Sequence, residues 1–316
     1  MDVLTLLDGG AQPLRELVLQ RHRIRRQIGL APSLHGRIVR LSYRSVDHVL
    51  VMSLLRAGSQ AKEGREMGQS GFSRGHRDAP MSPSIIDVKK LSRAELAGRI
   101  DATLLRPEAT DDDVTRLCRV ASSLGAATVC VSPARLPLRP GALAPGIGCA
   151  AVVGFPSGAH RRAVKVAEAR QAVEDGATEL DMVLDLGALR DRAWVDVRAE
   201  VAAVRAAVPA AVLLKVILES GLLEDADLVR ACEEVERAGA DYVKTSTGFH
   251  PAGGHTLHAV EVMAAAVGGR LGVKASGGVR STDQAIAVLR SGATRIGASD
   301  VAAVLAGLPT ESQVLG

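Results

Sequence analysis

The sequence predicts an α/β protein in which eight parallel strands close into a (β/α)₈ TIM barrel. From Leu91 onward, eight strand-like segments, each followed by a helix or a loop, alternate over about 200 residues. Strands such as Val212-Leu213-Leu214 are almost continuously apolar, which is typical of parallel strands buried on both faces. Lys215, Lys244 and Lys274 recur at spacings of 29 and 30 residues, the length of one strand–helix–strand unit. A doubly wound open sheet is the second choice.

The first half of the pattern begins with Ser92, which we expect to cap a short helix with Glu95 as its capping-box partner. Residues 100–105 form the first strand. Thr110 caps a helix that runs to Leu124, with acidic residues in its first turn where the helix dipole favours them. Further strands are expected at 127–132, 148–155 and 179–185. Helices are expected at about 160–175 and up to 208, before Pro209.

The second half predicts strands at 211–219, 242–247, 271–276 and 294–298. Helices are expected at about 224–238, 256–267 and 282–290, and a last one begins at about Asp300. In such barrels the chemistry lies at the carboxyl ends of the strands. Asp181, Lys244 and Lys274 lie within or near the carboxyl halves of their strands, so we expect them to meet at one mouth of the barrel.

Composition excludes several classes of function. Hydrophobic residues make up 47% of the 316 residues, and no run of about 20 uncharged apolar residues is present, so no membrane span is expected. The net charge of +4 arises from residues 1–80, which carry +6 against −2 for the rest. A basic surface for nucleic acid is therefore not expected on the barrel. The four cysteines show no CxxC spacing, which favours structural thiols in a reducing cytoplasm.

Residues 1–80 differ from the barrel that we assign to residues 81–316. Residues 59–80 are rich in Gly, Ser and charged residues without an apolar period. Three interpretations remain open for residues 1–80. They are upstream sequence read from a misassigned start, with Met67 or Met81 the real one, a disordered or partly helical extension, or a regulatory or nucleic-acid-binding arm.

The lysines suggest covalent chemistry. Asp181 and Lys215 alone could form a buried structural ion pair, but each additional buried charge adds a desolvation cost, so the convergence favours a function. A lysine amine with a pKa of about 10.4 must be lowered to about 7–8 to act as a nucleophile. Burial and the neighbouring Lys274 can lower the pKa of Lys244, which could then form an imine with an aldehyde or ketone. Asp181 can move protons through water or Lys274. No metal-ligand spacing is present and no cofactor is required.

A phosphate site is expected beside these residues. Gly277 and Gly278 follow the seventh strand, and Gly297 to Ser299 lead from the eighth strand into a helix. The loops after strands seven and eight, with a helix N-terminus, commonly hold phosphate in this fold. Gly248 ends the sixth strand and opens the loop that we assign to the same substrate-binding region.

The motifs along the barrel resemble those of a known family. Residues 91–308 are similar to deoxyribose-phosphate aldolase, a class I (Schiff-base) aldolase with a (β/α)₈ barrel. The resemblance is carried by IDATLLRPEAT (100–110), VGFPSG (153–158), ELDMV (179–183), LKVILE (214–219), VKTSTGF (243–249), VKASGG (273–278) and RIGAS (295–299).

The resemblance implies reversible cleavage of 2-deoxy-D-ribose 5-phosphate to D-glyceraldehyde 3-phosphate and acetaldehyde, a reaction of deoxyribonucleotide catabolism. It assigns the Schiff base to Lys244 and proton transfer to Asp181 and Lys274. We expect Lys215 to act in support. A related Schiff-base aldolase acting on another sugar phosphate is one alternative, and a non-catalytic phosphosugar-binding barrel is another. A homodimer is possible, because exposed barrel helices often pair.

Asp300 departs from the family pattern, in which a small neutral residue commonly follows Ser299. A carboxylate 4 Å from the phosphate would be repelled by about 4 kcal/mol at an effective dielectric of 20. We therefore expect Asp300 to cap the last helix. The alternative is that it selects against phosphate.

Overall fold

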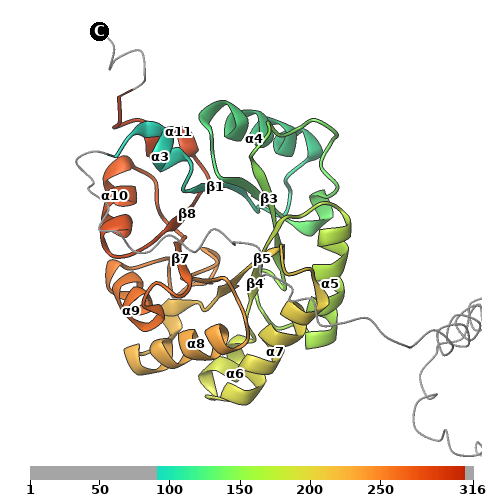
Figure 1. Cartoon of the computed structure of the whole chain (residues 1–316), viewed down its shortest axis with the longest axis vertical. Coiled ribbons are helices and arrows are strands. Elements are labelled where there is room, and N and C mark those ends of the chain that lie inside the picture. The colour runs from blue at the N-terminus through green and yellow to red at the C-terminus, as the bar shows by residue number, and fades with distance from the viewer. Residues whose placement is uncertain (1–90, 310–316) are drawn as a thin grey trace, which may run out of the picture. The chain divides into compact units, whose positions relative to one another are not determined.

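The computed structural model describes residues 91–309, so the expectations for residues 1–80 lie outside the described range. The strands form a closed parallel barrel, and Figure 1 shows the helices arranged around it. The barrel closes where β1 pairs with β8, with Asp101 opposite Gly297. This closure confirms the predicted barrel and excludes the open sheet.

Each strand hydrogen-bonds to the next in sequence order. The strands are β1 (Ile100–Leu104), β2 (Thr128–Val131), β3 (Gly148–Val153), β4 (Glu179–Val183), β5 (Leu213–Ile217), β6 (Tyr242–Lys244), β7 (Gly272–Ala275) and β8 (Arg295–Ala298).

Except after β4, the helices follow the strands as predicted, and two short 3₁₀ turns lie in the loops. They are α3 (Arg93–Ala97), α4 (Asp111–Leu124), η3 (Pro133–Arg135), α5 (Arg162–Glu174), α6 (Leu186–Arg190), α7 (Trp194–Ala207), η4 (Ser220–Leu222), α8 (Asp225–Arg237), α9 (Leu257–Val267), α10 (Thr282–Arg290) and α11 (Val301–Leu305). None of the helices within residues 91–309 is long and apolar enough to cross a membrane.

The caps confirm the local signals in the sequence. Ser92 and Thr110 both form complete capping boxes, with Glu95 and Asp113 as partners. The main difference lies after β4, where α6 and α7 replace the single predicted helix. The strand ends two residues early because Asp185 accepts hydrogen bonds from the backbone of Gly187 and Ala188, which begins α6.

The two faces of the strands have different chemistry. Residues on one face pack with the helices in a large apolar core that includes Leu180, Met182, Leu214, Val216, Val243 and Val273. Because side chains alternate along a strand, Asp181, Lys215, Lys244 and Lys274 lie on the other face, inside the barrel. A smaller apolar cluster of Leu105, Cys130, Ala150 and Val152, with Phe155 packed against it, is separate from the large core.

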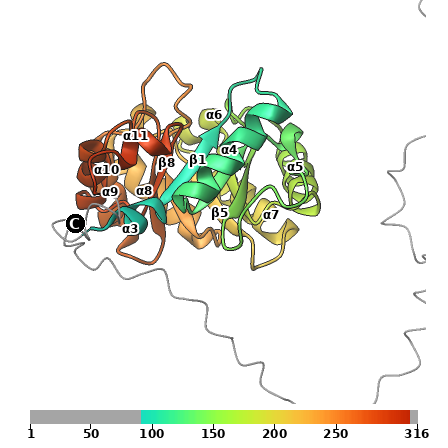
Figure 2. The same ribbon diagram turned by 90° about the horizontal axis from the view of Figure 1, so that it is seen from above.

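The loops at the carboxyl ends of the strands lie at one edge of the barrel. In Figure 2 the loop after β6, in orange, projects from the same edge as the loop between β1 and α4, and α3 lies at the opposite edge. The strands that carry the predicted catalytic side chains therefore end on the side of the barrel where these loops lie.

Candidate active site

The strand register brings the predicted catalytic residues together. Lys244 ends β6 and lies directly opposite Lys274 of β7, and Asp181 of β4 lies opposite Lys215 of β5. Asp181, Lys215 and Lys274 are 0% exposed and Lys244 is 3% exposed. The expectation that these side chains converge is confirmed.

The Asp181 carboxylate is shared by all three lysines. Its Oδ2 atom accepts hydrogen bonds from Lys244 Nζ at 2.7 Å and from Lys274 Nζ at 2.6 Å. Its Oδ1 atom accepts from Lys215 Nζ at 2.8 Å. The ion pair between Asp181 and Lys215 is therefore real, but it is one part of a larger group.

Three further charged residues, which the sequence did not single out, complete this group. Asp101 Oδ2 pairs with Lys274 Nζ, and Asp101 Oδ1 accepts from Arg295 Nη1 at 2.9 Å. Glu179 Oε2 lies 2.5 Å from Lys215 Nζ, and its Oε1 lies 3.5 Å from Arg295 Nη2. Asp101 could have been found in the sequence because it is a charged residue inside a predicted strand. Its partner Lys274 is 173 residues away, so the pairing was not visible in sequence.

The group, which we call the charge cluster, has unequal numbers of positive and negative charges. It contains four cations and three carboxylates, namely Lys215, Lys244, Lys274 and Arg295 with Asp101, Glu179 and Asp181. A net charge in a buried site is costly. Loss of one proton from one lysine makes the cluster neutral.

The contacts indicate which lysine loses that proton. Within residues 91–309, Lys215 lies within 4 Å of three carboxylates and Lys274 of two, whereas Lys244 contacts Asp181 alone. Arg295 stays charged at any ordinary pH. Lys244 has the weakest support for its ammonium form and is the lysine that deprotonates first.

The pKa shifts agree with this order. Burial lowers the pKa of Lys244, Asp181 opposes that effect, and Lys274 lowers the pKa further, so that the net shift is downward. Burial also lowers the pKa of Lys274, but Asp101 and Asp181 outweigh it and raise the pKa above its ordinary value. The direction of this shift agrees with the effect that we expect Lys274 to have on Lys244.

The carboxylate at the centre stays ionised. Burial raises the pKa of Asp181, but the three surrounding ammonium groups hold the pKa well below its ordinary value. Cys130 Sγ lies 3.9 Å from Asp181 Oδ2, and burial raises the pKa of this thiol to about 11. The site at neutral pH therefore combines an amine with lowered basicity, a protonated lysine and a carboxylate.

Of the glycines predicted to bind phosphate, Gly248, Gly277 and Gly278 lie in loops, whereas Gly297 lies within β8. A Cβ atom added to Gly248 would lie 3.3 Å from Gly277 Cα, so the loops after β6 and β7 meet backbone to backbone. Gly278, with φ 109°, and Ser299 are exposed. Gly297 is buried, and a side chain there would press on Ser276 and on Lys274 Cε. Gly297 therefore lies beside Lys274, and the exposed Ser299 follows it two residues later.

Asp300 lies where the capping hypothesis placed it. Its Oδ1 atom accepts a hydrogen bond of 2.9 Å from the backbone N–H of Ala303, at the start of α11. The predicted helix cap is confirmed, and the carboxylate is engaged with its own helix.

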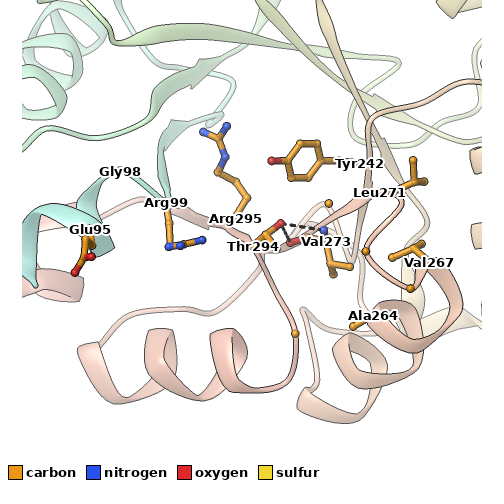
Figure 3. Close-up of a pocket in the computed structure, with 14 residues that line it drawn as sticks. Glu95, Gly98, Arg99, Tyr242, Ala264, Val267, Leu271, Val273, Thr294 and Arg295 are labelled. Carbon is orange, nitrogen blue, oxygen red and sulfur yellow. Dashed lines mark hydrogen bonds between the residues drawn. The ribbon is translucent and has the colours of Figure 1, made fainter. Parts of the chain in front are cut away.

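A pocket of about 490 Å³ opens at the other end of the barrel, at the amino ends of β6, β7 and β8 (Figure 3). Arg295 and Tyr242 lie side by side in it, with the guanidinium carbon 5.9 Å from the ring centroid. Arg295 also donates to Asp101, so this member of the charge cluster lines the pocket as well. Asp181, Lys244 and Lys274 do not line this pocket, so it is separate from the place where the predicted catalytic side chains meet.

In the described part of the chain, no group of three or more His, Cys, Asp or Glu side chains is arranged to hold a metal ion.

Comparison with known proteins gives matches in which this chain covers nearly the whole relative. Residues 63–309 match the family described as DeoC/LacD family aldolase. A deoxyribose-phosphate aldolase from Nocardia farcinica is 56% identical over 219 residues, which are 69% of this chain and 97% of the relative. One from Kocuria rhizophila is 53% identical over 218 residues, which are 69% of this chain and 99% of the relative.

Solved structures agree with these sequence matches. The tetrameric deoxyribose phosphate aldolase from Aeropyrum pernix is 37% identical to this chain, with a TM-score of 0.64. The match covers 72% of this chain and 96% of that structure.

Proposed function

This chain belongs to the DeoC/LacD family of aldolases, and we propose that it reversibly cleaves 2-deoxy-D-ribose 5-phosphate to D-glyceraldehyde 3-phosphate and acetaldehyde. The observation that carries the assignment of the nucleophile is the charge balance. Four cations and three carboxylates favour one neutral lysine, and Lys244 has the fewest carboxylate partners. The names of the relatives support the choice of substrate.

In the proposed mechanism, the neutral Lys244 amine attacks the aldehyde carbon C1 of the open-chain sugar and forms a carbinolamine. Loss of water gives an iminium at C1, next to the saturated carbon C2. Removal of the proton from the C3 hydroxyl breaks the C2–C3 bond, and its electron pair moves into the iminium. Glyceraldehyde 3-phosphate leaves, and the enamine of acetaldehyde stays on Lys244. Protonation at C2 and hydrolysis release acetaldehyde and restore the amine.

Lys274 and Asp181 supply the proton transfers in this proposal. Lys274 is protonated because its pKa is raised, so it can donate a proton when the carbinolamine loses water. Asp181 stays ionised and contacts both amines through one oxygen, so it can hold a proton in transit between them, directly or through a water. Lys215 holds the other oxygen of Asp181 and acts in support.

The phosphate would bind at the backbone of the loops after β6, β7 and β8, with Gly248, Gly277, Gly278 and Ser299 as its nearest groups and Gly297 beneath them. Exposed glycines support this proposal because they leave backbone N–H groups accessible. Asp300 is compatible with it because its carboxylate is occupied by Ala303.

Borohydride reduction in the presence of acetaldehyde tests the function. We expect a stable adduct on Lys244 in the native chain, together with release of glyceraldehyde 3-phosphate from deoxyribose 5-phosphate in a coupled assay. An adduct on Lys274 or Lys215 would contradict the assignment of roles. An adduct without turnover of deoxyribose 5-phosphate would favour another sugar phosphate.

We further propose that the enzyme is a cytoplasmic homo-oligomer, with a homodimer as the smallest unit. The four cysteines are buried free thiols, and a relative forms a tetramer. Light scattering on the purified chain would measure the oligomeric state, and a monomeric mass would contradict this proposal.

A further inference from the structure

Glu219, at the carboxyl end of β5, combines three unusual features. It is 0% exposed, and its backbone has φ 51° and ψ 59°, in the left-handed region that non-glycine residues avoid. Unlike Asp101 and Asp181, whose oxygens accept from ammonium groups, its carboxylate accepts from a hydroxyl and a backbone amide. A strained backbone conformation of this kind is kept only where the surrounding contacts hold it in place, and such conformations are often found at functional sites.

The backbone hydrogen bonds show that Glu219 is an inserted residue. Leu218 N–H donates to the carbonyl of Lys244, as the register of β5 and β6 requires. In a regular parallel ladder, Ser220 N–H would donate to the carbonyl of Ser246, two residues after Lys244. In the structure it donates instead to the carbonyl of Thr245. The β5 side therefore contains one extra residue, which is a β-bulge.

The bulge directs the Glu219 carboxylate at the loop that follows Lys244. Glu219 Oε2 accepts a hydrogen bond of 2.7 Å from the Thr247 hydroxyl, and both carboxylate oxygens lie 3.3 Å from Thr247 N. Thr247 Oγ1 in turn accepts from Phe249 N–H at 3.1 Å. These contacts fix the residues on both sides of Gly248.

The same loop is held on its other side by β7. Ser246 Oγ donates to the carbonyl of Ser276, and Ser276 Oγ donates to the carbonyl of Ser246, both at 2.6 Å. A Cβ atom added to Gly248 would lie 3.3 Å from Gly277 Cα, and one added to Gly277 would lie 3.2 Å from Gly248 Cα, so the two backbones are in close contact. The orientation of the Gly248 backbone relative to Gly277 thus depends on Thr247, and Thr247 depends on Glu219.

We propose that Glu219 is a positioning residue that acts through Thr247 to hold Gly248 against Gly277 and so shapes the part of the site that receives the substrate phosphate. This inference rests on the proposed function and adds a residue that does not touch the substrate. Imine formation at Lys244 does not depend on this contact, because Lys244 is fixed by Asp181 within β6.

The test compares Thr247→Val, which removes the hydroxyl at nearly constant volume, with Thr247→Ser, which keeps it. For each, KM and kcat are measured with deoxyribose 5-phosphate and with unphosphorylated 2-deoxyribose. We expect Thr247→Val to raise KM for the phosphorylated sugar by about tenfold or more, the scale of one lost hydrogen bond to a charged group. KM for 2-deoxyribose should change by less than about twofold, and Thr247→Ser should resemble the native chain with both sugars.

Glu219→Gln gives a second, independent measurement. It keeps one acceptor oxygen but turns an NH₂ group toward the Thr247 amide, so we expect a change in the same direction as Thr247→Val and smaller in size. The proposal would be overturned if Thr247→Val changed KM equally for both sugars, so that the ratio of KM for 2-deoxyribose to KM for deoxyribose 5-phosphate (the KM ratio) stayed unchanged. Borohydride trapping of acetaldehyde separates the two hypotheses. Failure of the native chain to trap refutes the proposed function, whereas normal trapping with an unchanged KM ratio refutes only the role of Glu219.

Discussion

Replacement of Lys274 by Met tests whether charge balance keeps Lys244 neutral. The Nζ atoms of Lys244 and Lys274 contact the same oxygen of Asp181 at 2.7 and 2.6 Å, so they are at most about 5.3 Å apart. Two unit charges at that distance repel by about 3 kcal/mol at an effective dielectric of 20, which corresponds to about two pKa units. Without Lys274, the cluster has three cations and three carboxylates, and its neutral state is the one in which Lys244 is protonated.

The sign of the expected pH effect follows directly. Loss of the neighbouring ammonium raises the pKa of Lys244, so a smaller fraction of the amine is neutral at pH 7. The acid limb of the pH profile, where the rate rises as Lys244 deprotonates, should move upward by about two pH units. We expect the rate of acetaldehyde trapping at pH 7 to fall by about 10², and to recover partly at higher pH.

The control is Lys165→Met, which removes another fully buried lysine. Lys165 Nζ pairs with Glu200 at 2.7 Å and donates to the carbonyl of Val183, outside the charge cluster. This variant should lose thermal stability and keep the acid limb of the native chain. An unchanged acid limb in Lys274→Met, or an equal shift in both variants, would refute the charge-balance argument.

Three further predictions follow from the same contacts. Lys244→Arg should abolish both turnover and trapping, because a guanidinium stays protonated and forms no imine; adduct mass spectrometry checks this. Asp300→Ser should lower the free energy of unfolding by about 0.3–1 kcal/mol, because serine can still cap the helix but the negative charge at its N-terminus is lost. It should change KM for deoxyribose 5-phosphate by less than about threefold, and a tenfold gain in kcat/KM for this sugar alone would show that Asp300 selects against phosphate. A chain that begins at Met81 should fold and turn over like the full chain, because every described strand and proposed catalytic residue follows it; circular dichroism and the coupled assay measure this.

Much of the barrel could be predicted from local sequence. The period of about 30 residues, the apolar strands and the caps at Ser92 and Thr110 depend on neighbours within one unit, and the structure confirms them. The convergence of Lys244 and Lys274 was also predictable, because equivalent positions on consecutive parallel strands lie side by side.

The composition of the charge cluster was decided by the tertiary structure. Asp101 meets Lys274 and Arg295 because the barrel closes between β1 and β8, which joins residues 173 and 194 positions apart. No local pattern encodes such a pairing, and without it the cations and carboxylates cannot be counted.

The bulge at Glu219 was likewise decided by the tertiary structure. The sequence LKVILE reads as a continuous strand, and only the hydrogen bonds to β6 show that one residue is extra and that its carboxylate turns toward Thr247. The sequence by itself determined the fold, and it was enough to propose Lys244 as the reactive lysine. The electrostatic balance that lowers the pKa of this lysine, and the register that orients the loop beside it, depend on contacts between distant strands.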